Sequence, residues 1–284
     1  YPHTHGIEHN AWHGVPKDVM SPLPAMLRES AGYRTGAFGK IHLGAWSANV
    51  GFDTIESCCD TTIGEAGDSS RECEYHRYLR EIGLFEEYRD TALNAPAEVL
   101  ENMHYGETTI PVEHCLETWT AQRTMDFIDE CDDAPFFAWC SFLRPHNPHM
   151  PPADAPVTYD PDAITLPEYD PLWFETKPGY CSRPSVETLW KASAIGEDHL
   201  RNALAGYYGL ISLIDQSIGT MLDHLRETGK LDNTIVIFTA DHGCLAGNYG
   251  QIGVNTMTLD EIYRIPYVWY SPGRIPRRQY CDLV

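Results

Sequence analysis

A carboxylate and an imidazole stand side by side at Asp241 and His242. Both types of side chain bind divalent metal ions, and Gly243, the next residue, lets the backbone turn close to such an ion. An adjacent pair of this kind is also typical of a turn held by a local hydrogen bond. The pair alone therefore leaves a metal site and a simple turn as alternatives.

A lysine and a histidine are separated by one residue at Lys40 and His42. In an extended segment alternate side chains lie on the same face, so these two would point toward one pocket. An ammonium group supplies fixed positive charge for an oxyanion, and an imidazole carries a proton near neutral pH. A surface lysine beside a hydrogen-bonded histidine would show the same spacing, and that alternative stays open.

A third polar segment begins at Arg144 and reads Arg-Pro-His-Asn-Pro-His. Its two prolines restrict the backbone and hold the histidines in place. His146 or His149 could protonate a leaving oxygen. The alternative is a loop bracketed by prolines, in which both histidines only make hydrogen bonds.

These polar segments follow stretches that are expected to be strands. Apolar runs predict strands at 33–38, 134–143, 233–240 and 265–270, the second of them fully buried. Helical spacing predicts helices at 21–31, 72–88, 112–131 and 197–228. Ser21 is the expected N-cap of the first helix, with Pro22 as its first residue. In the last helix we expect a break near Gly206 or Gly209 and a C-cap at Gly229.

Helices that alternate with strands predict an α/β fold, a mainly parallel, mixed sheet sandwiched between helices. In such sheets ligands bind beyond the carboxyl ends of the strands. The three polar segments follow three different strands, so we expect them to meet at that edge.

The composition excludes some classes of partner. A formal net charge of −21 disfavours nucleic acid and anionic membrane surfaces. No apolar run approaches the roughly 18 residues that a membrane-spanning helix needs, so no membrane span is expected. The nine cysteines are scattered without a CxxC pair, which predicts no disulfide framework.

Taken together and in order, the three segments resemble the signatures of type I sulfatases of the alkaline phosphatase superfamily. Residues 21–44 resemble that family's helix, strand and GKxHLG signature, and residues 142–152 resemble its PHxP loop. Residues 208–243 are similar to its long helix and the DNTIVIFTSDHG strand that follows. Residues 57–112 and 171–196 resemble the family poorly, and we expect them to be insertions into a single catalytic domain.

The resemblance implies a role for several residues. Asp241 and His242 fall on metal ligands of the family, whose ion is most often Ca²⁺ and sometimes Mg²⁺ or Mn²⁺. Lys40 falls on the lysine that contacts the sulfate and the nucleophile, and His42 on the histidine that hydrogen-bonds the nucleophile. His146 falls on the histidine near the ester oxygen, which makes it the expected general acid. Arg144 and His149, on the same loop, are expected to bind substrate.

The family nucleophile is a formylglycine made from the first residue of a C/S-x-P-x-R motif. It is expected upstream of Tyr1, together with two further metal-binding aspartates. Cys181-Ser-Arg-Pro-Ser185 holds similar residues in a scrambled order and is taken as a coincidence. We therefore expect residues 1–284 to form an incomplete catalytic domain that lacks the nucleophile segment and the C-terminal subdomain. Such a chain should be inactive by itself.

One position departs from the family pattern. Val254 stands where the family usually has a lysine that binds sulfate. A valine cannot do this, so either another cation such as Arg144 substitutes, or the site is weakened, or the substrate differs.

The resemblance implies hydrolysis of a sulfate ester, of a small molecule or a carbohydrate. The alternatives are a phosphonate monoester or phosphodiester hydrolase of the same superfamily and a non-catalytic sulfatase-like protein. A periplasmic or secreted location would be typical of the family, although no signal peptide is visible in this sequence. The sequence leaves the oligomeric state undetermined.

Overall fold

The computed structural model describes residues 22–41, 51–58, 73–89, 105–168, 170, 195–250, 252–253 and 259–278. The elements follow one another as α2 (Leu23–Ala31), β1 (Arg34–Lys40), β2 (Thr54–Cys58), α3 (Glu74–Glu81), α4 (Phe85–Tyr88), η4 (Val112–His114), α6 (Leu116–Glu130), β3 (Phe136–Ser141), η5 (Pro161–Ala163), α9 (Glu197–Glu227), η8 (Leu231–Asn233), β4 (Val236–Thr239), β5 (Leu245–Ala246), η9 (Asn248–Gly250), β6 (Ile252–Gly253), α10 (Asp260–Tyr263) and β7 (Tyr267–Tyr270). The predicted helices and strands are thus found at or near their expected positions.

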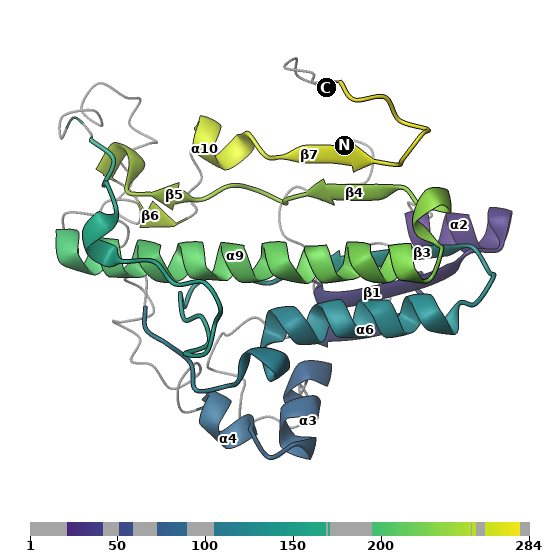
Figure 1. Ribbon diagram of the computed structural model, residues 1–284, viewed down its shortest axis with the longest axis horizontal. Coiled ribbons are helices and arrows are strands. Elements are labelled where there is room, and N and C mark those ends of the chain that lie inside the picture. The colour runs from purple at the N-terminus through teal and green to yellow at the C-terminus, as the bar shows by residue number, and fades with distance from the viewer. Residues whose placement is uncertain are drawn as a thin grey trace.

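A parallel sheet with the strand order β2-β1-β3 forms one part of the structure (Figure 1). Its central strand β1 is buried over its inner residues because small side chains let neighbouring elements approach. At Gly39, whose φ of +91° suits glycine, an added Cβ would overlap the carbonyl oxygen of Ser141 in β3. The expected α/β fold with a parallel sheet and covering helices is confirmed.

A second sheet pairs β4 with β7 in antiparallel fashion, and Figure 1 shows it on the other side of α9 from α6. Its side chains are largely exposed, in contrast to those of β1. Large apolar side chains are exposed on both strands: Ile237, Phe238, Tyr267, Val268, Trp269 and Tyr270. Within the described part of the chain, β3 and β4 do not pair.

The helix α6 packs on β1 and β3 and also contacts α9. Phe38 of β1 and Phe127 of α6 meet with their ring centroids 5.4 Å apart. Leu225 near the end of α9 and Leu231 after it join the same apolar cluster. This cluster fixes the two helices against the parallel sheet.

A second apolar cluster joins α3 and α4 to the start of α6. Tyr75 of α3 is fully buried there, and its ring lies 5.3 Å from that of Trp119 in α6 and 5.6 Å from that of Tyr88 in α4. This aromatic packing attaches the described part of the 57–112 region firmly to α6. The predicted helical character of 72–88 is confirmed.

Three local expectations are wrong. The first helix begins at Leu23 with Pro22 as its N-cap, and Ser21 lies outside the described residues. The strand β3 is not fully buried, since Trp139 is 50% exposed; in the described structure β3 pairs only with β1 and its other edge is unpaired.

The third wrong expectation is the break in α9, which runs unbroken over 31 residues. Its glycines serve close packing instead: a Cβ at Gly206 would overlap the carbonyl oxygen of His149, and one at Gly209 would lie 3.2 Å from Pro151. The polar loop after β3 therefore packs against α9 at Gly206 and Gly209. None of the described helices has the length and apolar character needed to cross a membrane.

Candidate active site at the carboxyl edge of the strands

Three polar segments leave the carboxyl ends of strands, as the sequence predicts. Lys40 is the last residue of β1, Asp241 follows β4, and Arg144 follows β3. β1 and β3 run parallel with Gly39 opposite Ser141, so the segments after them start at the same edge of the sheet. Lys40 and the histidine loop, by which we mean residues 144–149, therefore start at one edge of this sheet, whereas Asp241 follows a strand of the other sheet.

Lys40 and Asp241 are in direct contact. Lys40 Nζ donates a hydrogen bond of 3.2 Å to Asp241 Oδ2, and the lysine side chain is mostly buried. Burial raises the pKa of Asp241, but the Lys40 ammonium, His242 and hydrogen bonds outweigh it, so the pKa lies below its ordinary value. The Asp241 carboxylate is therefore ionised at neutral pH, and the Lys40 ammonium group lies next to it.

The Asp241-His242 pair is held by local hydrogen bonds. The backbone N–H of His242 donates to Asp241 Oδ1 at 3.0 Å, and His242 Nδ1 lies 2.9 Å from the Gly243 carbonyl oxygen. His242 Nε2 lies 3.6 Å from Asp241 Oδ2. Gly243 packs so closely on α10 that a Cβ there would overlap the Glu261 carbonyl oxygen. The turn interpretation of this pair is thus correct in its geometry, and it leaves Asp241 Oδ2 and His242 Nε2 near each other.

These two atoms fit part of a metal shell. A carboxylate oxygen suits Ca²⁺, Mg²⁺ and Mn²⁺, and a neutral imidazole nitrogen suits Mn²⁺ and the later transition metals. Asp241 also forms an ion pair with the ammonium group of Lys40. Across the described residues, no three His, Cys, Asp or Glu side chains converge on one point. Within the described residues, Asp241 and His242 therefore have the chemistry of two donors to a divalent ion, and no third donor joins them.

The two histidines of the histidine loop have different surroundings. His146 is exposed, and its Nδ1 lies 2.8 Å from the Asn147 carbonyl oxygen. His149 is buried, and its ring meets that of Tyr207 in α9 edge to face at 5.3 Å. Burial, together with the charges of Arg144 and His146, lowers the pKa of His149 to about 3. At neutral pH His149 is therefore uncharged, and of the two only His146 is accessible to a substrate.

Arg144 turns inward and holds its own loop. Its side chain is buried at 8% exposure, and its Nη1 donates to the carbonyl oxygens of His146 at 2.9 Å and Pro148 at 3.0 Å. The Arg144-Pro145 and Asn147-Pro148 peptide bonds are both cis. This geometry favours a role in shaping the histidine loop over direct contact with a substrate.

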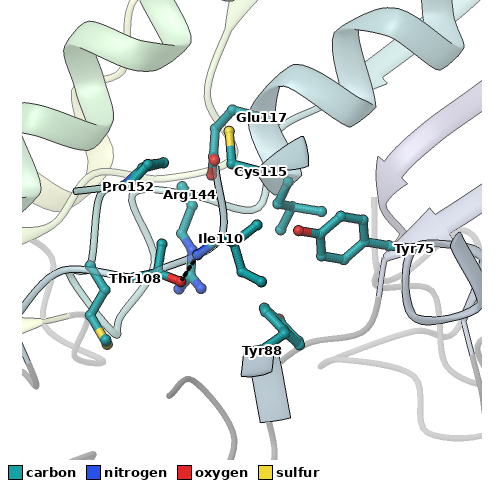
Figure 2. A pocket seen from close by; sticks show the side chains of 10 residues that line it. Tyr75, Tyr88, Thr108, Ile110, Cys115, Glu117, Arg144 and Pro152 are labelled. Carbon is teal, nitrogen blue, oxygen red and sulfur yellow. Dashed lines mark hydrogen bonds between the residues drawn. The ribbon is translucent and has the colours of Figure 1, made fainter. Parts of the chain in front are cut away.

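The predicted site residue His42 lies outside the described residues, as does Val254, the position that departs from the family pattern. One residue that the sequence analysis missed is Glu117, in the first turn of α6. It is buried and lines a cavity together with Arg144 (Figure 2). The available signal was its position: Thr120 and Thr124, one and two turns further along α6, lie on the same buried face.

Known proteins match this chain over most of its length. The profile of the family described as Sulfatase matches residues 1–282. An arylsulfatase of Clostridium perfringens (strain 13 / Type A) is 30% identical over 259 residues, which are 86% of this chain and 51% of that protein. A choline-sulfatase of Rhizobium meliloti (strain 1021) is 24% identical over 252 residues, 87% of this chain and 46% of that protein. The chain thus spans about half the length of these relatives.

The fold is likewise shared with solved structures. The crystal structure of the phosphonate monoester hydrolase of Agrobacterium radiobacter superposes with a TM-score of 0.71 at 20% identity, covering 96% of this chain and 56% of that one. The profile match over nearly the whole chain and the likeness to curated sulfatases lead to one conclusion. The chain belongs to the sulfatase family.

Proposed function

We propose that the protein that contains this chain hydrolyses sulfate esters. The observation that carries the proposal is the contact between Lys40 and Asp241, which places an ammonium group beside a carboxylate at the carboxyl edge of the strands. An ionised sulfate ester needs positive charge around it, and a strongly acidic protein must supply that charge locally. Membership of the sulfatase family supports the same reaction.

In this proposal each side chain has its own task. Lys40 binds a sulfate oxygen through its ammonium group and balances the negative charge there. His146, which is exposed, gives a proton to the ester oxygen as the alcohol leaves. His42 assists the nucleophile, a role that rests on the family resemblance. His149, which is buried and uncharged, positions the loop against α9 in place of protonating the substrate.

The metal and the nucleophile complete the proposal. Asp241 and His242 would hold a divalent cation, Ca²⁺ before Mg²⁺ or Mn²⁺, whose charge stabilises the negative charge that develops on the sulfate oxygens. The nucleophile that we propose is a formylglycine outside residues 1–284. The exposed apolar side chains of β4 and β7 support an incomplete catalytic domain, because such a surface is normally covered by further chain.

The proposed substrate is a sulfate ester of a small molecule or a carbohydrate. The two curated relatives are named for an aryl ester and for choline, so within the family the alcohol differs from one protein to another. Initial rates of the full-length protein on an aryl sulfate, an aryl phosphonate and an aryl phosphodiester test the reaction type. We expect the highest kcat/KM on the sulfate.

A phosphonate monoester hydrolase is the second candidate, because a structure of that name shares the fold at a TM-score of 0.71. A higher kcat/KM on the phosphonate or the phosphodiester would select it. A non-catalytic protein is the third candidate, and Val254 is the residue that favours it. A large gain of activity in a Val254→Lys variant would indicate a decayed sulfate site, whereas an already active parent would exclude decay.

A further inference from the structure

A small cavity lies behind the histidine loop, between the start of α6 and the segments around residues 108–110 and 150–152 (Figure 2). Its volume is about 30 Å³, which is enough for one water molecule. Its lining is aromatic and apolar apart from a few polar groups, and it includes one acid, Glu117, and one base, Arg144. The cavity, which is partly open, therefore has one acidic and one basic side chain in its lining.

Arg144 needs a negative charge in its surroundings. A guanidinium group stays protonated in proteins, and Arg144 is only 8% exposed to solvent. Its hydrogen bonds to His146 and Pro148 go to neutral carbonyl oxygens. None of the ion pairs among the described residues includes Arg144. A buried charge without a compensating partner is costly, so an acid nearby would stabilise it.

Glu117 is the acid that faces the same cavity. It is only 3% exposed, and its Oε1 has no hydrogen-bond partner. Burial is the largest influence on the pKa of Glu117 and holds it above the ordinary value, although the Arg144 charge, the backbone N–H of Glu117 itself and the Cys115 thiol each lower it. It also stands in the first turn of α6, where the helix dipole favours a negative charge. The unpartnered oxygen and the cavity together fit one bridging water.

We infer that Glu117 is a positioning residue for the histidine loop: its carboxylate, with a water in the cavity, balances the charge of Arg144, which holds the carbonyl groups of His146 and Pro148. Glu117 touches no substrate in this arrangement. Through its effect on Arg144, it helps to fix the position of His146 in the proposed site. The catalytic part of this inference rests on the proposed role of His146 as general acid, whereas the structural part does not.

The catalytic test uses the full-length protein with a Glu117→Gln variant, which keeps the shape of the side chain and removes the charge. Glu56→Gln is the matched control, because Glu56 also pairs with an arginine on α6, Arg123, through two bonds of 2.7 Å, but away from the histidine loop. We expect kcat of Glu117→Gln to fall about 10- to 100-fold on an alkyl sulfate with a poor leaving group. On p-nitrophenyl sulfate, whose leaving group needs little protonation, we expect a much smaller fall. Glu56→Gln should leave the ratio of the two rates unchanged.

A structural measurement separates this inference from the proposed function. Hydrogen exchange of the four backbone amides of the histidine loop, at Arg144, His146, Asn147 and His149, should be faster in Glu117→Gln and in Arg144→Lys than in the parent and in Glu56→Gln. The double variant should exchange no faster than Arg144→Lys alone, because both residues act through one set of contacts. Unchanged exchange in both single variants, or an equal fall in kcat on both esters, would overturn the inference. A parent without sulfatase activity would end the proposed function and leave the exchange experiment valid.

Discussion

Lys40 Nζ lies 3.2 Å from Asp241 Oδ2, although 201 positions separate the two residues in the chain. The contact joins the end of the buried strand β1 to the turn after the exposed strand β4. Because those strands belong to different sheets, no backbone pairing brings the two side chains together. The two charged groups form an ion pair after the ends of their strands, and we place the centre of the proposed site at this pair.

An Asp241→Asn substitution tests that centre. The amide is the same size but carries no charge, so it weakens the proposed metal site and leaves Lys40 without its counter-charge. In the full-length protein we expect kcat on an aryl sulfate to fall at least about 100-fold, with only partial recovery at high Ca²⁺ concentration. Asp223→Asn, at an exposed position in α9, is the control and should stay fully active. Retention of more than half of the activity by Asp241→Asn would contradict the assignment.

Two glycines of α9 provide a matched pair for the docking of the histidine loop. A Cβ at Gly206 would overlap the His149 carbonyl oxygen, whereas one at Gly219 would meet nothing within 4 Å. We expect Gly206→Ala to lower the free energy of unfolding by about 2 kcal/mol through overpacking. Gly219→Ala should raise it by about 1 kcal/mol, because alanine favours a helix. Urea denaturation of both variants measures this, and equal effects at the two positions would show that the loop does not pack on Gly206.

These glycines also show where sequence patterns mislead. Helical spacing alone located α9, and apolar runs located β1, β3, β4 and β7, because each pattern reports a local preference for burial. Glycine inside a helix usually marks a weak point, so the sequence predicts a break near Gly206 or Gly209. The real cause lies in another segment, since His149 approaches the helix so closely that no side chain fits. A contact of this kind has no local signature.

Glu117 was missed for a similar physical reason. An acid in the first turn of a helix normally faces solvent and favours the helix dipole, so its identity gave no sign of burial. Its surroundings depend on Tyr75 and Arg144, which come from other elements. In contrast, the sequence predicts that Lys40 and the histidine loop start at one edge, because each follows a strand and the parallel strands β1 and β3 end at the same edge. Asp241 follows a strand of the other sheet, so its contact with Lys40 has no such local signature.

His149 predicts a dependence of stability on pH. Burial holds its pKa at about 3 in the folded protein, and the ordinary value of 6.5 applies to the unfolded chain. Between these values only the unfolded chain binds the proton, so the free energy of unfolding falls as the pH falls below about 6.5. From pH 7 to pH 5 this group alone should remove about 2 kcal/mol.

A His149→Gln variant isolates that contribution, because glutamine has no proton to gain in this range. Urea denaturation at pH 7 and pH 5 should show a smaller loss of stability in the variant than in the parent, by about the same 2 kcal/mol. An identical loss in both proteins would show that His149 is protonated, or solvated, in the folded state.

The isolated chain 1–284 should not hydrolyse sulfate esters. Burial raises the pKa of Cys115 and Cys140 to about 12 and that of Cys244 to about 11, so none of these thiols is a nucleophile at neutral pH. Among the described residues no three His, Cys, Asp or Glu side chains come together, so the proposed ligands Asp241 and His242 would be two alone, and two ligands hold Ca²⁺ weakly. We expect no turnover of p-nitrophenyl sulfate by the purified chain, with or without added Ca²⁺, under conditions in which the full-length protein is active. Turnover by the chain that disappears in Asp241→Asn would refute the proposal that the nucleophile lies outside it.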